Sequence, residues 1–479
     1  MLALALMVLV GGATGGWLLW QRLHDHQDIT IAAERPGEVS APWPTPSTSR
    51  TPRPGERRFV TSVSENGRYF VDQYGVPLLV QGDSPWSLMT DLSPAQAELY
   101  FRNRGEQGFN AAITSLVGGE GNGGPSDNGG TFDGLIPFVD GDVTAWQEPY
   151  WERMTRYLEV AAESGITVFL YPIDGWTIGE AFHPETIEQC QTYGRMVAER
   201  FRDLPNLVWM SGGDYFPKAD DPASGSDVDQ CIDASMRGIR GAGDNRPFSI
   251  QLGYPRSIST DNSYWTDRVS WNFVYTYLPT YVAVLQAYAR NPVIPALFGE
   301  GNYERENNVV DTPDTTNQTL RRQMLWALTS GAAGAFYGSD DWEFHPGWEQ
   351  RLNTEAVAQL GRMHDQFSQL PWWSLVPDTA RPWVTAGRGT ALTDDTGQDV
   401  LDNDYVTAAK SVDGRLAVAY FPGEHTVTVD RGALAAGARA VWIDPASGAS
   451  RMVPITDTFT TPGLNADGDD DWLLVITAR

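Results

Sequence analysis

Residues 206–214 read Asn-Leu-Val-Trp-Met-Ser-Gly-Gly-Asp, an apolar run that ends in small residues and an acid. Residues 293–304 have the same form and read Val-Ile-Pro-Ala-Leu-Phe-Gly-Glu-Gly-Asn-Tyr-Glu. Short apolar runs of this kind are typical of buried strands. In a closed parallel barrel, a polar residue at the carboxyl end of a strand faces the mouth. The two stretches therefore predict strands whose final acids, Asp214 and Glu300, meet at one mouth.

Apolar runs alternate with helical patterns over about 310 residues around these two stretches. We predict strands at 77–82, 110–116, 166–171, 206–210, 247–252, 269–275, 293–298 and 335–337. We predict helices from residue 93 and at 149–164, 184–202, 228–240, 281–290, 317–330 and 354–370. Eight strands with intervening helices indicate an α/β fold, a (β/α)8 TIM barrel. The alternative, a doubly wound sheet, requires a glycine-rich phosphate-binding turn after the first strand, and residues 82–86 (Gly-Asp-Ser-Pro-Trp) are not one.

We place the barrel at 59–374. The rest of the chain differs from it in sequence pattern and composition. From residue 375 to 479, short alternating runs separated by turn signals such as Asp413-Gly414 predict a small C-terminal β-sandwich, an accessory domain. Residues 21–58 are polar and rich in Pro, Ser and Thr, so they predict a linker without a core of its own.

Residues 1–20 are apolar and contain no charged side chain. About 20 such residues can span a bilayer, which makes this segment a membrane anchor. A cleavable signal peptide is the alternative, although a basic start is missing. With either interpretation the folded part lies outside the cytoplasm, secreted or anchored, and contacts the membrane only through this segment.

The charge and composition of the 479 residues narrow the class of partner. The net charge is −27, with 34 Lys and Arg against 61 Asp and Glu. Because so acidic a surface repels phosphate backbones, nucleic acid is excluded as a partner and a neutral glycan is favoured. The 18 tryptophans agree with a carbohydrate substrate, since indole rings line sugar clefts, but they also fill cores.

The two cysteines, Cys190 and Cys231, do not have the spacing of a metal site. Either they are free and buried or, in an oxidising compartment, they form a disulfide. Clustered His and acidic ligands are also missing, so we expect no metal and no cofactor.

Acids and aromatic residues follow seven of the eight predicted strands. For these side chains we expect substrate binding: Asp83, Trp86, Asp174, Trp176, Tyr215, Tyr254, Tyr275, Tyr277, Tyr303, Glu304, Asp341 and Trp342. One such acid means little, because helix N-caps use Asp routinely, and Glu304 is also a candidate partner for an arginine. A set at seven strand ends is better explained by one shared site.

Glycosidic bond cleavage needs a proton donor and a second carboxylate. In many barrel glycosidases these two groups follow strands four and seven, which face each other across the mouth. Asp214 and Glu300 hold those places, so we expect Asp214 to be the acid/base and Glu300 the nucleophile of a retaining enzyme, with Tyr275 or Tyr303 bonded to the nucleophile.

The chain resembles the apiosidase-like glycoside hydrolase family. Residues 67–72 and 82–86 and the Gly-Phe-Asn at 108–110 look like the opening of that family. The Trp-x-x-Gly-Gly-Asp at 209–214 and the Gly-Glu-x-x-Tyr-Glu at 299–304 resemble its catalytic motifs. The resemblance implies a barrel, a retaining mechanism and a pentofuranoside substrate such as apiose or arabinose. The C-terminal part resembles a module named for collagen binding.

Three other functions compete with this one. A serine esterase is suggested by Gly82-Asp83-Ser84, but neither His345 nor His364 sits in a suitable block. A metal hydrolase lacks its ligand set. A non-catalytic glycan-binding or adhesive surface protein remains the main alternative, although it would not need both Asp214 and Glu300.

A glycine-rich insertion at 118–134 follows the second predicted strand. A plain flexible loop is the simplest interpretation. It is also a candidate lid or a gate on substrate length, because it flanks the expected cleft. Its acids do not have the spacing of a standard calcium loop.

Overall fold

The computed structural model describes residues 52–478 except 54, 179, 185, 216–226, 307–314, 381 and 393–397. The predicted anchor or signal segment and nearly all of the linker lie outside these residues. Within the described part of the chain, no helix combines the length and the apolar character that a membrane span requires.

Eight parallel strands form the centre of the barrel, as predicted. They are β4 (Val80–Asp83), β5 (Ala111–Ser115), β8 (Thr167–Tyr171), β9 (Leu207–Tyr215), β10 (Phe248–Leu252), β12 (Asn272–Thr276), β13 (Ala296–Glu300) and β14 (Ala332–Tyr337). Their order in the sheet is β10-β9-β8-β5-β4-β14-β13-β12. The chain therefore winds round the barrel once, and the carboxyl ends of all eight strands meet at one mouth.

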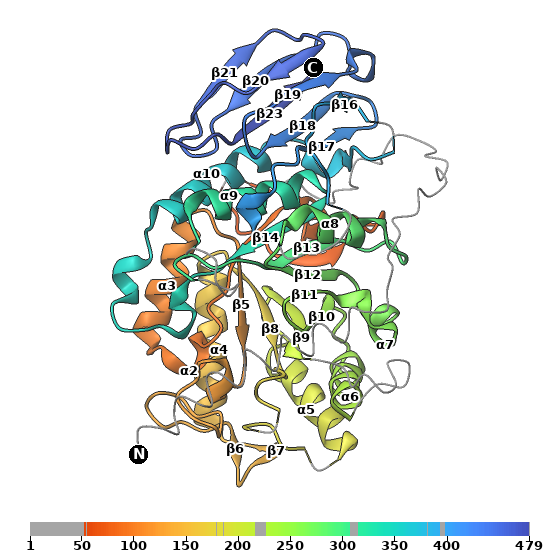
Figure 1. Ribbon diagram of the computed structural model, residues 1–479. Helices are drawn as coiled ribbons and strands as arrows, with labels where there is room; N and C mark the ends of the chain where they lie inside the picture. The colour runs from red at the N-terminus through yellow and green to blue at the C-terminus, as the bar shows by residue number, and fades with distance from the viewer. Residues whose placement is uncertain are drawn as a thin grey trace.

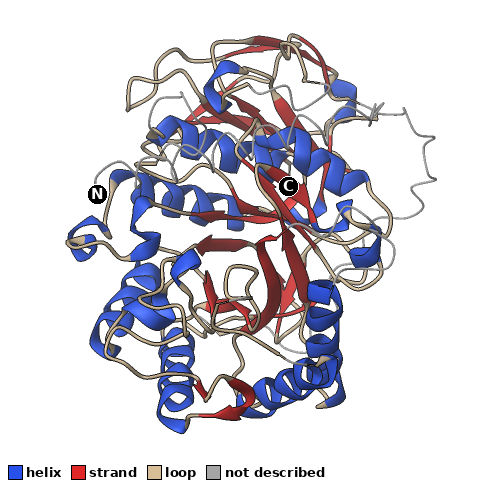
Figure 2. Cartoon of the chain, turned by 60° about the horizontal axis from the view of Figure 1, so that its bottom comes forward, coloured by secondary structure: helices blue, strands red, loops and turns tan. Residues whose placement is uncertain are grey.

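Helices surround the strands, as Figure 2 shows. They are α3 (Pro94–Glu106), α4 (Glu148–Glu163), α5 (Ile187–Arg200), α6 (Asp227–Gly241), α8 (Thr280–Ala289), α9 (Asn317–Thr329) and α10 (Glu355–Ser368). Each lies within a few residues of its predicted place. Helix α3 illustrates the local reason: the Ser93 side chain accepts from the N–H of Gln96, the Gln96 side chain accepts from the N–H of Ser93, and Pro94 opens the helix.

The barrel closes between β10 and β12 without a regular ladder. A short strand, β11 (Arg256–Ile258), pairs with β12 in the antiparallel sense at this point. The Ser259 hydroxyl then donates to the carbonyl of Ile250 at 2.7 Å and accepts from the N–H of Phe273 at 2.8 Å. One side chain thus supplies hydrogen bonds that a direct pairing would have made.

The first predicted strand is corrected by the structure. Residues 77–82 divide into β3 (Pro77–Leu78) and β4, which belong to different sheets. β3 completes a small antiparallel sheet with β1 (Val60–Val63) and β2 (Phe70–Asp72). The division falls at Leu79, whose carbonyl accepts from the side chain of Asn110 at 2.8 Å. A hairpin of β6 (Phe138–Val139) and β7 (Asp142–Trp146), which the sequence did not reveal, precedes α4.

The C-terminal residues form two antiparallel sheets, in agreement with the predicted β-sandwich. The larger has the order β15 (Leu375–Pro377), β17 (Thr407–Ser411), β18 (Leu416–Phe421), β23 (Trp472–Thr477), β20 (Arg439–Ile443) and β21 (Ser450–Val453). The smaller contains β16 (Val384–Ala386), β19 (Thr426–Val429) and β22 (Thr458–Thr460). A separate hydrophobic cluster that includes Trp383, Trp442 and Phe459 draws on both sheets.

The C-terminal sheets lie over helices α9 and α10 (Figure 1). Arg321 of α9 is completely buried, and its guanidinium contacts the carboxylates of Asp467 at 2.9 Å, Asp469 at 2.6 Å and Asp471 at 2.8 Å. The neighbouring Arg322 donates to backbone carbonyls, including that of Asn403 at 3.0 Å. The contact between the barrel and these sheets is therefore built on two buried arginines.

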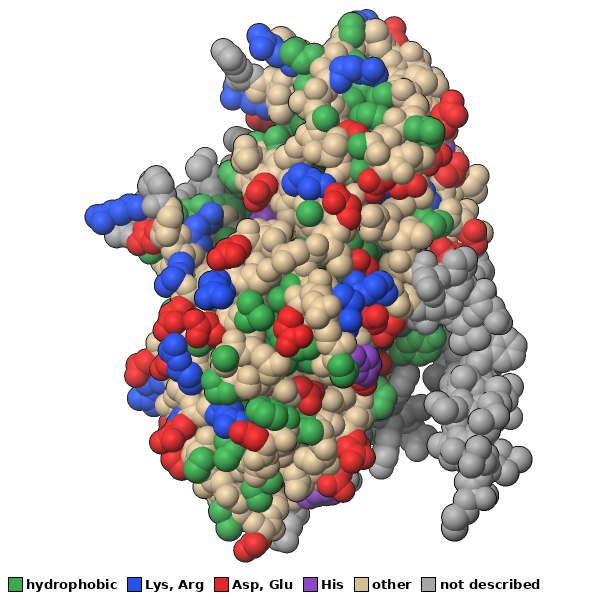
Figure 3. Space-filling view, turned by 90° about the vertical axis from the view of Figure 1, so that its left-hand side faces the viewer, with side chains coloured by type: hydrophobic (Ala, Val, Ile, Leu, Met, Phe, Trp, Pro, Cys, Tyr) green, Lys and Arg blue, Asp and Glu red, His purple; other side chains and the backbone are tan. Residues whose placement is uncertain are grey.

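Cys190 of α5 and Cys231 of α6 form a disulfide, with their Cα atoms 5.3 Å apart. The sequence left open whether the two cysteines are free or bonded, and in the structure they are bonded. Elsewhere on the surface, acidic and basic side chains are interspersed, as on the face in Figure 3. Exposed pairs such as Arg195–Glu199 contribute little to stability.

Candidate active site

Asp214 sits on a bulge at the end of β9. Gln251 of β10 pairs with Gly212, but the next residue, Leu252, pairs with Tyr215, so Gly213 and Asp214 are extra in the ladder. Gly212, Gly213 and Asp214 all have positive φ angles, of 97°, 87° and 52°. Glycine adopts such angles freely and aspartate tolerates them better than most residues. The Gly-Gly-Asp sequence thus turns the carboxyl group out of the normal alternation of the strand.

Glu300 is placed by a second bulge, at the end of β13. Val274 of β12 pairs with Phe298, whereas Tyr275 pairs with Glu300, which leaves Gly299 extra. A Cβ atom on Gly299 would lie 2.2 Å from the ring of Phe273, so a larger residue does not fit there. Both motifs identified in the sequence therefore work in the same way, with glycine providing the irregular step that directs the acid.

Hydrogen-bond donors converge on the carboxylate of Glu300. The side-chain amide of Gln251 donates to Oε2 at 2.7 Å, and the hydroxyl of Tyr277 donates to Oε1 at 3.2 Å. Tyr303 also bonds to Glu300, and its hydroxyl accepts from the indole of Trp86 at 2.7 Å. Burial raises the pKa of Tyr277 and of Tyr303 well above the usual value, so both keep their protons.

Asp214 has fewer partners than Glu300. The hydroxyl of Tyr275 and the backbone of Tyr254 bond to its carboxyl group. Among the residues that the structure describes, Oδ1 of Asp214 is buried without a hydrogen-bond partner. Such an atom is rare in a folded protein and is expected where a ligand group binds.

The three acids Asp174, Asp214 and Glu300 form one electrostatic cluster. Burial, followed by the charge of Asp214, raises the pKa of Glu300 well above its usual value. Burial raises the pKa of Asp214 to about 7, and the charge of Asp174 acts in the same direction. Burial also raises the pKa of Asp174 to about 6, against hydrogen bonds from Ser115, Trp176 and Asn122. Neighbouring carboxyl groups of this kind share protons, so the site retains at least one near neutral pH.

Several of the predicted binding residues lie around this cluster. Asp174 pairs with Gly212 in an isolated bridge, and Tyr275 and Tyr277 lie with their hydroxyl oxygens 3.0 Å apart. Tyr254 has 41% of its surface exposed and its ring is 5.5 Å from that of Tyr277. Trp176 is 47% exposed. Trp86 and Tyr303 complete the group through their contact with Glu300.

Other predicted residues are occupied by contacts outside the cluster. The Tyr215 hydroxyl accepts from the indole of Trp265 at 2.8 Å. Glu304 accepts from Thr354 at 2.9 Å and pairs with Arg305 at 3.3 Å, which is the role that the sequence left open for it. The indole of Trp342 donates to Glu306 at 2.9 Å.

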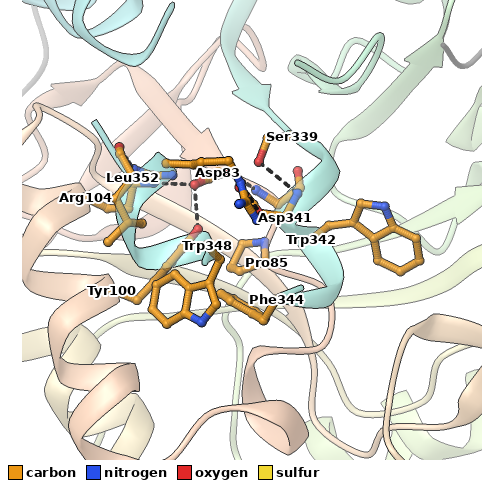
Figure 4. Close-up of a pocket in the computed structure, with 12 residues that line it drawn as sticks. Asp83, Pro85, Tyr100, Arg104, Ser339, Asp341, Trp342, Phe344, Trp348 and Leu352 are labelled. Atoms are coloured by element: carbon orange, nitrogen blue, oxygen red, sulfur yellow. Dashed lines mark hydrogen bonds and ion pairs between the residues drawn. The ribbon is translucent and has the colours of Figure 1, made fainter. Parts of the chain in front are cut away.

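Asp83 and Asp341 line a small pocket beside the cluster (Figure 4). Asp83 is buried in an ion pair with Arg104 and accepts from the hydroxyl of Tyr100 at 2.5 Å. Asp341 pairs with Arg351 and, at 2.7 Å, with Arg305. Neither Asp214 nor Glu300 lines this pocket. Because its acids are neutralised by arginines, we assign the chemistry to the Asp214–Glu300 cluster instead.

Two residues of the cluster, Gln251 and Tyr171, were not predicted from the sequence. The Tyr171 hydroxyl donates to Oε1 of Gln251 at 2.7 Å, which directs the amide nitrogen of Gln251 towards Glu300. A signal was present in the sequence, because Gln251 is a polar residue inside a predicted buried strand.

No group of His, Cys, Asp and Glu suited to a metal ion occurs among the described residues. The carboxylates of the cluster instead accept from hydroxyl, side-chain amide and backbone N–H donors. The arrangement can hold a proton on one acid and a negative charge on another. The exposed rings of Tyr254 and Trp176 lie around the same cluster.

Comparisons with known proteins identify the family of the chain and support its fold. Residues 64–374 match the family model described as the Apiosidase-like catalytic domain. No curated protein matches the chain. Among solved structures, a glycoside hydrolase family 5 protein from Bacteroides vulgatus is similar, with a TM-score of 0.73, 20% identity and coverage of 87% of this chain and 93% of the other. A structure described as a glycoside hydrolase has the same TM-score and identity, with coverages of 88% and 97%. These two likenesses show the fold.

Proposed function

The chain belongs to the apiosidase-like family of glycoside hydrolases, and we propose that Asp214 is its catalytic acid/base and Glu300 its nucleophile. The family establishes glycoside hydrolysis and a carbohydrate substrate. The proposal concerns the residues that perform the reaction, its stereochemistry and the sugar.

The single observation that carries the assignment is the unequal distribution of hydrogen-bond donors. Gln251, Tyr277 and Tyr303 bond to Glu300. Donors stabilise the charged form of a carboxyl group and so oppose the rise in the pKa of Glu300 that burial and the charge of Asp214 cause. Once Asp214 is protonated its charge is gone, and the single negative charge of the pair is best held on Glu300. A charged carboxylate is the form that attacks an anomeric carbon.

Asp214 is suited to the opposite role. Its burial raises its pKa to about 7, so the carboxyl group is protonated over much of the neutral and acidic range. Its unpartnered Oδ1 is the atom that can carry this proton to a bound substrate. A buried acid with a raised pKa beside a charged carboxylate is the arrangement that separates the two roles in glycosidases.

The proposed reaction has two steps and retains configuration. Asp214 first protonates the oxygen of the leaving group while Glu300 attacks the anomeric carbon, which breaks the glycosidic bond and gives a glycosyl-enzyme ester. Asp214, now a carboxylate, then removes a proton from a water molecule that attacks the same carbon and releases Glu300.

We propose a pentofuranoside such as apiose or arabinose as the sugar, on the strength of the family likeness. The exposed rings of Tyr254 and Trp176 provide faces on which a small sugar ring can stack. Hydrolysis outside the cytoplasm is supported by the Cys190–Cys231 disulfide, because such bonds persist in oxidising compartments. The apolar segment at 1–20 would then be the only contact with the membrane.

The test is a panel of 4-nitrophenyl glycosides that includes apiofuranosides and arabinofuranosides. We expect Asp214→Ala and Glu300→Ala each to reduce kcat/KM by about 10²- to 10⁴-fold or more. A matched control is Glu163→Gln, on the exposed side of α4, which should leave activity unchanged. Activity that survives either alanine would reject the assignment, and inactivity of the wild-type protein on every glycan would favour a binding protein.

Stereochemistry has its own readout. Proton NMR of the first product formed should show the anomer of the substrate. An inverted product would mean that a water molecule, and not Glu300, attacks the anomeric carbon.

A further inference from the structure

The positions of the two acids determine the direction of a bound glycan. Asp214 ends β9 and Glu300 ends β13, and the barrel order places β10 and β12 between them on one side. The other side contains β14, β4, β5 and β8. A chain that passes between the two carboxyl groups must therefore run from the β10–β12 side of the mouth towards the β4–β5 side.

The start of the glycine-rich insertion crosses the β4–β5 side. Residues 118–124 follow β5 and contact loops on both of its flanks. After β8, Trp176 and Glu180 lie so close that Cβ atoms on Gly121 and Gly119 would come within 3.0 Å and 2.5 Å of them. After β14, Glu343 would lie 2.7 Å from a Cβ atom on Gly123. The segment thus bridges the loops that follow β8 and β14.

Hydrogen bonds hold this crossing segment in one shape. The side chain of Asn122 accepts from the N–H of Gly119 at 2.8 Å and donates to Asp174 at 3.4 Å. The N–H of Gly124 donates to the carbonyl of Gly119 at 2.8 Å. Because Asp174 belongs to the acid cluster, Asn122 ties the segment directly to the site.

The loop after β4 packs against the same region. The hydroxyl of Ser87 donates to the carbonyl of Trp342 at 3.1 Å. The preceding Trp86 reaches Tyr303 beside Glu300. Figure 4 shows Pro85 and Trp342 on neighbouring elements, with the indole of Trp342 directed away from Tyr100 and Trp348. Loops after β4, β5, β8 and β14 therefore meet on one side of the carboxyl groups.

We propose that this wall makes the enzyme exo-acting: residues 118–124 close the β4–β5 end of the cleft, so that the terminal sugar of a chain occupies the closed end and is released singly. The inference rests on the proposed function and specifies its substrate as a chain end. The rest of the glycan extends over the β10–β12 side. Side chains at the glycines 119, 121 and 123 would meet the flanking loops, and Gly123 also has a positive φ of 83°.

The experiment compares internal and terminal cleavage by the full chain. On the sugar that the 4-nitrophenyl panel identifies, we expect the monosaccharide as the sole early product from unsubstituted oligosaccharides. We expect no soluble dye from the matching dye-cross-linked polysaccharide, which is released only by internal cuts. Early oligosaccharide products or released dye would overturn the inference and leave the assignment of Asp214 and Glu300 intact. A protein inactive on all 4-nitrophenyl glycosides would overturn both.

Variants of the crossing segment add a second readout. Gly121→Val should raise KM for the 4-nitrophenyl glycoside more than it lowers kcat, because its side chain displaces the segment from Trp176 and disturbs the closed end. A shortened segment that cannot reach Glu343 should gain dye release. Gly241→Ala is the matched control, since a Cβ atom there meets nothing within 4 Å. Unchanged KM in Gly121→Val, or a shortened protein that stays folded and active without dye release, would contradict the closed end.

Discussion

The side-chain amide of Gln251 donates a 2.7 Å hydrogen bond to Glu300, and Tyr171 fixes the orientation of that amide from behind. The donor comes from β10 and the acceptor from β13, so the bond spans the part of the barrel where the ladder is irregular. Glu300 is therefore held by a residue that is neither near in sequence nor on an adjoining parallel strand.

We expect Gln251→Leu to lower kcat about 10- to 100-fold, because a hydrogen bond to a charged group is worth roughly 1.5–3 kcal/mol. Loss of the donor raises the pKa of Glu300 further, so the acid limb of the pH profile of kcat/KM should move to higher pH. Tyr171→Phe should have a smaller effect in the same direction. An acid limb that stays in place would contradict the role of Gln251.

The alkaline limb should report on Asp214. The reaction requires this group to be protonated, and its pKa is raised to about 7 by burial, so kcat/KM should fall as the pH rises through about 7. The Tyr275 hydroxyl lowers this pKa. Tyr275→Phe should therefore move the alkaline limb to higher pH, and a shift to lower pH would show that another group is titrating.

Asp83 should behave as a structural residue. Asp83→Asn removes the charge that compensates the buried Arg104, and breaking a buried ion pair costs about 3–5 kcal/mol. We expect a lower midpoint in urea unfolding but nearly normal kcat at temperatures where the variant is folded. A large loss of kcat in a stably folded Asp83→Asn protein would instead indicate that Asp83 takes part in catalysis or substrate binding.

Arg321 should be as important for stability as Asp83. Replacement of Arg321 by methionine leaves three aspartates close together, two of them partly exposed, and should lower the free energy of unfolding by about 3–5 kcal/mol. Arg321→Lys should recover only part of this, since an ammonium group cannot bridge several carboxylates as a guanidinium does. Arg415→Ala, in an exposed pair, is the control and should unfold at the wild-type urea concentration.

The disulfide should contribute measurably. Loop closure over a separation of 41 residues predicts a stabilisation of about 3–4 kcal/mol. The double variant Cys190→Ala, Cys231→Ala should unfold at lower temperature, and a reducing agent should lower the unfolding temperature of the wild type but not of the variant. Equal unfolding temperatures for reduced and oxidised wild type would contradict this.

The barrel was predictable because its signals are local. Each strand is a short apolar run, and caps such as Ser93 mark where helices begin. The order of the strands follows from the alternation of elements, so Asp214 and Glu300 could be placed at one mouth before any contact was known.

The fate of individual side chains was not predictable, because it depends on partners distant in the chain. Asp83 has the same local pattern as Asp214, yet Arg104 of α3 neutralises it, and none of the arginines that the structure describes pairs with Asp214. The bulges at Gly213 and Gly299 depend on the register with β10 and β12, which no single strand reveals. Gln251 was missed for the same reason: its importance comes from Glu300, on another strand.

The burial of Arg321 also affects where the chain can be truncated without loss of the enzyme's stability. The family match stops at residue 374, which invites truncation there. A protein cut at that point would expose on α9 two guanidinium groups that are enclosed in the full chain, one among aspartates and one among backbone carbonyls. The C-terminal sheets thus cover a polar surface of the barrel's own helix α9. A minimal catalytic unit should therefore include these sheets.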